Sequence, residues 1–232
     1  MKQYLRTLRR AIYEARGNPK YTPQPSLNDL DAKLSKYLDY TNGFFIEVGA
    51  NNGYKQSNTY YLERGLKWRG VLVEAIPELY ERCRKLRKHS RVFHNALVAP
   101  DYPEDEITMH FADLMSVTEG SMGTTERQQE HIDLGLECQK IDKSYTVHVP
   151  VRTLGSILDE VGPPPIDFFS LDVEGYELNV LKGLNIEKYR PEYILVEAWE
   201  YDEIDAFLQP YYDQVDKLTF HDYLYRVRPA GN

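Results

Sequence analysis

Short apolar runs recur along the chain, and most of them have an acidic or amide residue at or near their end. They cover residues 44–48, 71–74, 92–98, 166–172 and 193–197. Continuous rather than alternating apolar positions are typical of parallel strands that are buried on both faces. Amphipathic segments lie between the runs and favour helices, for example over residues 78–88. The order strand, helix, strand, helix, strand predicts a doubly wound α/β sheet.

The first 40 residues have a different pattern. Apolar positions at helical spacing predict one helix over residues 2–16 and a second over residues 27–38, where Ser26 is a suitable N-cap. We therefore expect residues 1–40 to form a helical extension in front of a domain that covers residues 41–232.

Two later segments complete the pattern. Residues 116–143 are mostly polar and too long for a bare turn, so we expect a helix within them and a site at their border. They are flanked by alternating segments at 107–111 and 147–151, which predict two paired strands. Residues 217–220 and 223–227 predict an antiparallel hairpin that closes the sheet.

Composition narrows the class of protein. The 232 residues are 42% hydrophobic and 28% charged, which favours a soluble globular domain, and the net charge of -8 argues against a nucleic-acid binder. No apolar run approaches the roughly 18 residues of a membrane span. Arg9 and Arg10 interrupt any signal-peptide pattern, so we expect a cytoplasmic protein. Cys83 and Cys138 provide neither a disulfide framework nor metal spacing.

The chemistry concentrates in the loop after the first apolar run. Gly49 and Gly53 permit positive φ and a close approach of a ligand to the backbone. Glu47 lies near the end of a buried strand and needs a partner there. A ligand ammonium, a ribose hydroxyl, a backbone amide or a lysine would each serve.

A second carboxylate indicates the type of cofactor. Glu74 ends the next apolar run, 25 positions after Gly49, which suits a group that binds both ribose hydroxyls of an adenosine. A nicotinamide dinucleotide would require G-x-G-x-x-G, but Asn51 stands at the second glycine position. Glu47 would also face an anionic pyrophosphate. S-adenosylmethionine carries an ammonium and no phosphate, so the electrostatics favour it.

The sequence resembles the FkbM-type family of class I S-adenosylmethionine-dependent methyltransferases. The matching blocks are residues 45–53 (FIEVGANNG), 57–59, 68–77 (WRGVLVEAIP), 95–97, 166–177 (IDFFSLDVEGYE) and 180–183. The resemblance implies a Rossmann-like, mostly parallel seven-stranded sheet whose last strand is antiparallel. It also implies methyl transfer to the hydroxyl of a small molecule, often a sugar or another natural product.

The resemblance also assigns roles to residues. Glu47, Gly49, Asn51 and Gly53, with Ala50 and Asn52 in the same loop, would hold the methionine part of the cofactor. Glu74 would bind the ribose, and Ala75 and Asn95 would border the adenine. Ser57 and Asn58 lie at a helix start, where capping and cofactor contact are both open. Residues 1–40 and 113–146, largely outside the shared blocks, would be the lid and acceptor-selecting pieces.

Asp172 and Glu174 are the candidate catalytic residues. They lie two positions apart at the end of a strand and would share a face if the strand continues. One would remove the acceptor proton and the other would orient the acceptor. Alternatively, Glu174 and Glu177 cap the following helix. Carboxylates here could also hold Mg²⁺, although no specific metal motif is present.

Two other functions remain open at this point. One is a nicotinamide-dependent oxidoreductase on the same fold, and the other is a methyltransferase-like binding module without turnover. His131 and His148 flank the polar stretch and could reach a substrate.

Overall fold

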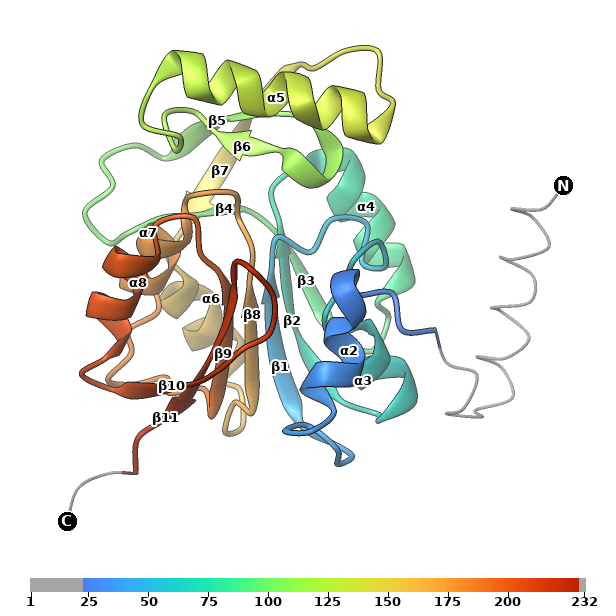
Figure 1. The fold of residues 1–232 in the computed structure, drawn as a ribbon, viewed down its shortest axis with the longest axis vertical. Helices are drawn as coiled ribbons and strands as arrows, with labels where there is room; N and C mark the ends of the chain where they lie inside the picture. Colours follow the sequence, from blue (N-terminus) through green and yellow to red (C-terminus); the bar gives the residue numbers. More distant parts are fainter. Residues whose placement is uncertain (1–22, 230–232) are drawn as a thin grey trace, which may run out of the picture.

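A seven-stranded sheet forms the centre of the computed structural model, which describes residues 23–229 (Figure 1). Its strand order is β10-β11-β9-β8-β1-β2-β3. The strands are β1 (Phe44–Val48), β2 (Arg69–Glu74), β3 (Arg91–His94), β8 (Phe168–Leu171), β9 (Tyr193–Glu197), β10 (Tyr212–Lys217) and β11 (Asp222–Val227). β11 is antiparallel to both β9 and β10, and the other pairs are parallel. The predicted fold class is therefore confirmed. The predicted helix over residues 2–16 lies outside the described residues.

Helices cover both faces of this sheet. α2 (Leu30–Leu34), α3 (Tyr60–Gly65) and α4 (Pro77–Leu86) lie on one face, where their apolar side chains pack with Phe45 and Leu72. α6 (Leu154–Val161), α7 (Glu177–Lys182) and α8 (Tyr201–Leu208) lie on the other face, with Ile46 and Val71. Successive strand residues thus point into opposite cores, as the unbroken apolar runs require.

A smaller sheet adjoins the carboxyl ends of the central strands. It has the order β4-β7-β5-β6 and consists of β4 (Ala96–Leu97), β5 (Glu106–His110), β6 (Val117–Thr118) and β7 (Thr146–Arg152). The connection from β5 to β7 contains η3 (Asp113–Met115) and α5 (Thr125–Gln139). The hydroxyl of Thr124 accepts from the backbone N–H of Arg127 and so caps α5. This helix, expected within residues 116–143, lies across the top of the molecule in Figure 1.

Three predicted elements have different bounds. The apolar run 92–98 is not one strand, because the chain leaves the central sheet at Asn95, whose Nδ2 donates to the carbonyl of Pro150 at 3.1 Å. The helix predicted over 27–38 is reduced to η2 (Leu27–Asp29) and α2, because Asn28 and Asp29 have φ angles of 52° and 59°. Its buried leucines nevertheless pack on the sheet as the pattern required.

The hairpin is also shifted relative to its prediction. Residues 217–220 were expected to form its first strand, but β10 ends at Lys217 and the next residues form the turn. The hydroxyl of Thr219 bonds the Asp222 carboxylate and accepts from the backbone N–H of Asp222 at 3.1 Å. A short side chain that satisfies nearby backbone and carboxylate groups favours a turn over a strand. Within residues 23–229, no helix has the length and apolar character needed to span a bilayer.

Candidate active site

A pocket with an empty volume of about 890 Å³ opens at the carboxyl ends of β1, β2 and β8. In doubly wound sheets this edge is the usual ligand site. Eight of the eleven predicted cofactor residues line the pocket: Glu47, Gly49, Asn51, Ser57, Asn58, Glu74, Ala75 and Asn95. Both predicted catalytic residues, Asp172 and Glu174, line it as well.

Ala50, Asn52 and Gly53 do not line the pocket, although they were predicted to hold the cofactor. Ala50 is buried in the core beneath α3 and α4. Asn52 Oδ1 accepts from the backbone amides two and three residues later, at 3.0 and 2.9 Å, and so shapes the loop. Gly53 has a φ of 78°, and a Cβ there would lie 2.8 Å from the side chain of Arg87. The three residues therefore shape and support the loop.

Gly49 is required for a similar steric reason, but directly at the pocket. Its φ is 83°, and a Cβ would lie 1.8 Å from the carbonyl oxygen of Asp172. Only glycine permits this approach between the loop after β1 and the end of β8. The loop and the predicted catalytic segment are thus held in direct contact.

Glu74 is buried at the pocket floor and accepts two backbone hydrogen bonds. The amide of Asn51 donates to Oε2 at 2.6 Å and that of Ile76 to Oε1 at 2.8 Å. Burial raises the pKa of Glu74 to about 7, in spite of these hydrogen bonds. Each oxygen retains a lone pair for a further donor. The carboxylate is therefore positioned to accept hydrogen bonds from a ligand.

The loop is also tied to the segment below α5. Asn51 Nδ2 donates to Asp113 at 3.1 Å, and Lys55 Nζ contacts the other oxygen of Asp113 at 2.8 Å. Lys55 also donates to Gln139 at the end of α5. The part of the chain predicted to be a lid is thus connected to the loop predicted to hold the cofactor.

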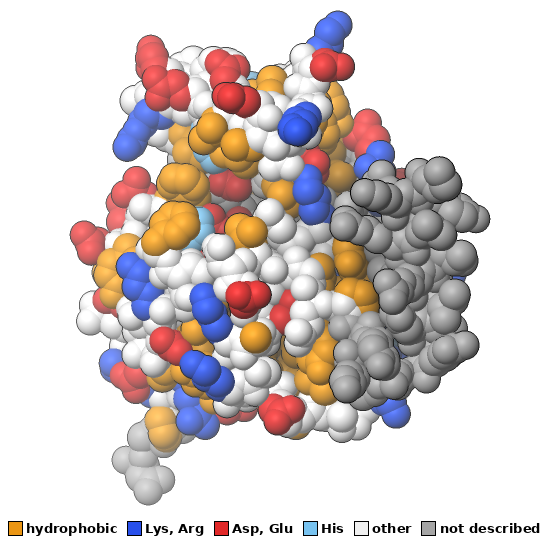
Figure 2. Space-filling view, turned by 45° about the vertical axis from the view of Figure 1, so that its right-hand side comes forward, with side chains coloured by type: hydrophobic (Ala, Val, Ile, Leu, Met, Phe, Trp, Pro, Cys, Tyr) orange, Lys and Arg blue, Asp and Glu red, His pale blue; other side chains and the backbone are white. Residues whose placement is uncertain are grey.

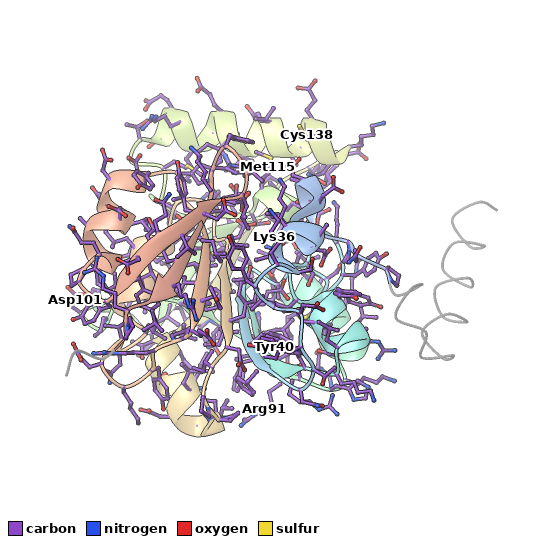
Figure 3. The ribbon with its side chains drawn as sticks, turned by 60° about the horizontal axis from the view of Figure 1, so that its bottom comes forward. Lys36, Tyr40, Arg91, Asp101, Met115 and Cys138 are labelled. Carbon is purple, nitrogen blue, oxygen red and sulfur yellow. The ribbon has the colours of Figure 1, made fainter. Side chains whose placement is uncertain are left out.

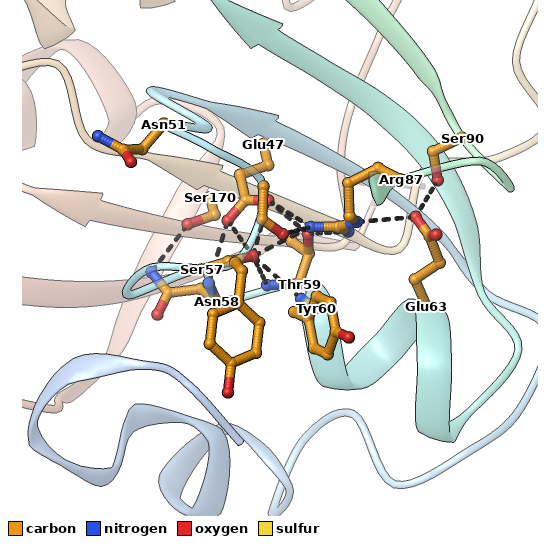
Figure 4. A network of polar contacts seen from close by, with 12 residues as sticks. Glu47, Asn51, Ser57, Asn58, Thr59, Tyr60, Glu63, Arg87, Ser90 and Ser170 are labelled. Atoms are coloured by element: carbon orange, nitrogen blue, oxygen red, sulfur yellow. Dashed lines mark hydrogen bonds and ion pairs between the residues drawn. The ribbon is translucent and has the colours of Figure 1, made fainter. Parts of the chain in front are cut away.

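Glu47 has its partners within the protein (Figure 4). Ser57 Oγ donates at 2.9 Å, the Asn58 amide at 3.0 Å, Thr59 Oγ1 at 2.6 Å and Arg87 Nη1 at 3.2 Å. Arg87 is fully buried, and its Nε also contacts Glu63 at 3.0 Å. The backbone amide was one of the predicted alternatives, but Arg87 was missed. It lies just after α4, and nothing in its local sequence marks it.

Ser57 and Asn58 precede α3, which begins at Tyr60 rather than at the predicted residue 57. Asn58 Nδ2 donates to Ser170 Oγ on β8 at 3.1 Å. The other amide atom, Oδ1, is buried and has no hydrogen-bond partner. A hydrogen-bond acceptor without a partner in a pocket wall is costly unless a ligand donates to it.

Beside the pocket, four carboxyl groups form a second feature, the acidic cluster: Asp172, Glu174, Glu197 and Asp222. They come from the ends of β8 and β9 and the start of β11. Asp172 and Glu197 share a hydrogen bond. Burial raises the pKa of Asp172 to about 6 and that of Glu174 to about 9. Burial and the neighbouring charge of Asp172 raise the pKa of Glu197 to about 11.

Two histidines complete this cluster. His131 Nε2, on α5, lies 3.3 Å from Glu174 Oε2. His221 Nδ1, in the hairpin turn, lies 3.2 Å from Glu197 Oε1. Burial lowers the pKa of both histidines, and a hydrogen bond to the backbone of Met115, beneath α5, opposes this for His131 (Figure 3). His148, the other histidine considered from the sequence, contacts Thr108 instead.

Asp172 and Glu174 do not share a strand face as predicted. β8 ends at Leu171, and Glu174 has a left-handed φ of 53° that turns the chain. Glu177, not Glu174, bonds the loop amides, accepting from Val173 at 3.1 Å and Gly175 at 3.0 Å. Glu177 therefore supports the loop before α7, and no side-chain hydrogen bond caps this helix, whereas the side chain of Glu174 faces His131 in the cluster.

Within the described residues, no group of three or more His, Cys, Asp or Glu side chains is arranged to hold a metal ion. The sequence suggested Mg²⁺ as a possible ligand, but the described residues contain no ligand set of this kind for it. Cys83 is buried and Cys138 is exposed on α5 (Figure 3), and both are free thiols.

Comparisons with known proteins were made for the sequence and the fold. The FkbM methyltransferase from Methylobacillus flagellatus KT is 13% identical, with a TM-score of 0.46; 88% of this chain and 56% of that one are covered. Fibrillarin from Aeropyrum pernix, solved with S-adenosyl-L-methionine, is 10% identical (TM-score 0.46; 87% and 76% covered). An O-methyltransferase from Bacillus cereus, solved with SAH, is 14% identical (TM-score 0.44; 94% and 87% covered). No curated protein matches the sequence.

The family comparison covers most of the chain. A family model described as the methyltransferase FkbM domain matches residues 47–227. This range begins at Glu47 on β1, ends with β11, and includes the pocket, the acidic cluster and α5. The chain therefore belongs to the FkbM methyltransferase family.

Proposed function

We propose that the pocket binds S-adenosylmethionine and that the protein transfers its methyl group to a hydroxyl of a small molecule, such as a sugar or another natural product. Membership of the FkbM methyltransferase family supports methyl transfer. The choice of cofactor and of the accepting atom rests on the pocket itself.

The choice of S-adenosylmethionine rests on Oδ1 of Asn58, which has no hydrogen-bond partner. S-adenosylmethionine has an ammonium group that can donate to this oxygen, whereas the pyrophosphate of a dinucleotide can only accept. Two hydrogen bonds hold Asn58 in place: its backbone N–H donates to Glu47, and its side-chain Nδ2 donates to Ser170. Carboxylates at Glu74 and Asp172, which also line the pocket, would disfavour an anionic cofactor there.

Glu74 is the residue proposed to hold the ribose. Its two oxygens each accept one backbone amide and can each accept a ribose hydroxyl as well. Hydrogen bonds from hydroxyls favour the ionised carboxylate, so cofactor binding would lower its raised pKa. Ala75 and Asn95 line the same pocket and would border the adenine.

When bound, the cofactor would supply a methyl group from a positively charged sulfur, which keeps the electron pair of the broken S–C bond and leaves as a neutral thioether. The protein must remove the hydroxyl proton as the new C–O bond forms. Asp172 is suited to this because it lines the pocket and its pKa of about 6 leaves it ionised at neutral pH. Glu174, with a pKa of about 9, remains protonated and can orient the acceptor by donating a hydrogen bond.

Residues 113–146 are proposed to select the acceptor. Asp113, Leu114, Ser116 and Thr118 from this stretch line the pocket, and α5 lies above it. Exchanging residues 113–146 for those of a relative should change which acceptor is methylated. Unchanged acceptor choice in the exchanged protein would refute this role.

Calorimetric titration with S-adenosylhomocysteine tests the cofactor. Replacing Glu74 by Gln or Asn58 by Leu should each weaken binding by about 1–3 kcal/mol, as expected when hydrogen bonds to a charged group are lost. Glu187→Gln is the matched control, because Glu187 is exposed in the connection before β9, at the opposite edge of the sheet. Failure of the wild type to bind, or tight binding of NADH, would overturn the proposal.

A further inference from the structure

The acidic cluster lies next to the cofactor pocket but extends beyond it. Glu197, Asp222 and His221 are outside the pocket lining, while Asp172 and Glu174 belong to both. Three elements surround it: α5, the residues after β9, and the β10–β11 turn. Figure 2 shows acidic and histidine side chains meeting in a hollow beneath the upper part of the molecule, with apolar side chains at its rim. The geometry suits an acceptor that enters from this side.

The cluster lacks a directly paired permanent cation within the described residues; burial raises the pKa of Asp222, and the nearby charge of Lys33 opposes this rise only in part. The ion pairs of its four carboxyl groups within residues 23–229 are with His131 and His221, and none is with a lysine or an arginine. Neither histidine provides a lasting positive charge, since burial disfavours its protonated form. Elsewhere in the core, Arg87 pairs with Glu47 and Glu63. Buried carboxylates without such a partner must bind protons or a cation.

A second observation points to a missing ligand. Glu174 Oε2 and His131 Nε2 face each other across the gap between the loop after β8 and α5, and both atoms are buried without a hydrogen-bond partner. Each residue is only 8% exposed. The two atoms are 3.3 Å apart, so a donor group placed beside both of them would satisfy a carboxylate oxygen and an imidazole nitrogen together.

Exposed aromatic side chains border the acidic cleft, which is the hollow that contains the acidic cluster. Trp199 is 49% exposed and lies edge-on to both His131 and His221, with centroid distances of 5.8 and 6.3 Å. Phe220 is 75% exposed and stacks on His221 at 3.7 Å. Aromatic rings attract cations through their faces and also cover the carbon atoms of a ligand. The cleft thus combines aromatic rims with an acidic floor.

We propose that this cleft is the acceptor site and that the acceptor carries a protonated amine, which the acidic cluster binds while the group to be methylated faces the cofactor pocket. This inference rests on the proposed function. It adds a substrate class, an amine-bearing small molecule, and places Glu197, Asp222 and His131 in acceptor binding. An uncharged sugar would leave the charge of the cluster to be balanced by bound protons alone.

Matched pairs of small molecules test the proposal on the full chain saturated with S-adenosylhomocysteine. The protonated amines are methylammonium, benzylammonium and glucosamine, and their uncharged counterparts are methanol, benzyl alcohol and N-acetylglucosamine. At pH 6.5 and constant ionic strength, at least one amine should bind about tenfold more tightly than its counterpart, as charge-assisted hydrogen bonds predict. Binding should also release protons, which calorimetry in buffers of different ionisation enthalpy detects.

Variants identify the site of this preference. Replacing Glu197 by Gln together with Asp222 by Asn should abolish the preference for the amine, whereas Glu187→Gln should retain it. An absent preference in every pair, or a preference that persists in the double variant, would overturn the inference. Because the binding of S-adenosylhomocysteine is measured first, failure of the proposed cofactor is distinguished from failure of the amine preference alone.

Discussion

Two groups of buried acids lie at the same edge of the central sheet, and they differ in the residues that they pair with. Glu47 and Glu63 are paired with the fully buried Arg87, and hydrogen bonds from the segment before α3 complete the network around Glu47. The acidic cluster has histidines where the first group has an arginine. An arginine remains charged at every pH relevant here, but a buried histidine does not.

This difference in counterions indicates that the first group stabilises the fold, whereas the acidic cluster has the properties of a binding site. Arg87 joins β1, the loop after it and α3, so its network fixes the shape of this loop. The acidic cluster has raised pKa values, shared protons and unpartnered atoms. Such properties are expected where protons or charged ligands are exchanged.

The largest expected effect comes from breaking the paired group. Replacing Arg87 by Met leaves Glu47 and Glu63 buried without a cation, which should reduce the free energy of unfolding by about 3–5 kcal/mol. Urea denaturation provides the measurement. Arg84→Met is the control, because Arg84 lies one turn earlier, on α4, is exposed and pairs with Glu81; the substitution should cost less than about 1 kcal/mol. Similar losses in both variants would show that the buried pair is not structural.

The next prediction concerns the cluster. Asp172→Asn removes the proposed base without altering size, so it should lower kcat by about 10²–10⁴-fold once an acceptor is known. Binding of S-adenosylhomocysteine should remain within a few-fold, because the contact of Gly49 with Asp172 involves the backbone. The wild-type rate should rise with pH through about 6, the pKa of this carboxyl group. An undiminished kcat would exclude Asp172 as the base.

The two groups also differ in what the sequence could predict. Glu47, Glu74 and Asp172 were found because each lies at the end of an apolar run, and strand ends in a parallel sheet meet at one edge. Glu197 likewise ends the apolar run 193–197, and His131 was considered because it lies in the polar stretch. Arg87 and His221 contribute through contacts between segments far apart in the chain, for which local patterns contain no signal. The fold followed from periodicity, but the break at Asn95 and the turn at Thr219 depend on side-chain hydrogen bonds.

The smallest predicted effect is on the pH dependence of the free energy of unfolding. The acidic cluster has pKa values raised above the ordinary 3.8 for Asp and 4.5 for Glu, so the folded state binds more protons than the unfolded state between about pH 5 and 9. The free energy of unfolding should therefore fall as pH rises through this range, by about 1.4 kcal/mol per pH unit for each extra proton held.

Urea denaturation at several pH values measures that dependence. Glu197→Gln removes the carboxyl group with the highest pKa in the cluster and should flatten the slope, whereas Glu187→Gln should leave it unchanged. A protonated amine bound to the cluster should oppose the loss of stability at high pH, because it replaces the protons with a cation. A slope that is equal in the wild type and Glu197→Gln would show that the cluster is already compensated, and would remove the distinction between the two groups of acids.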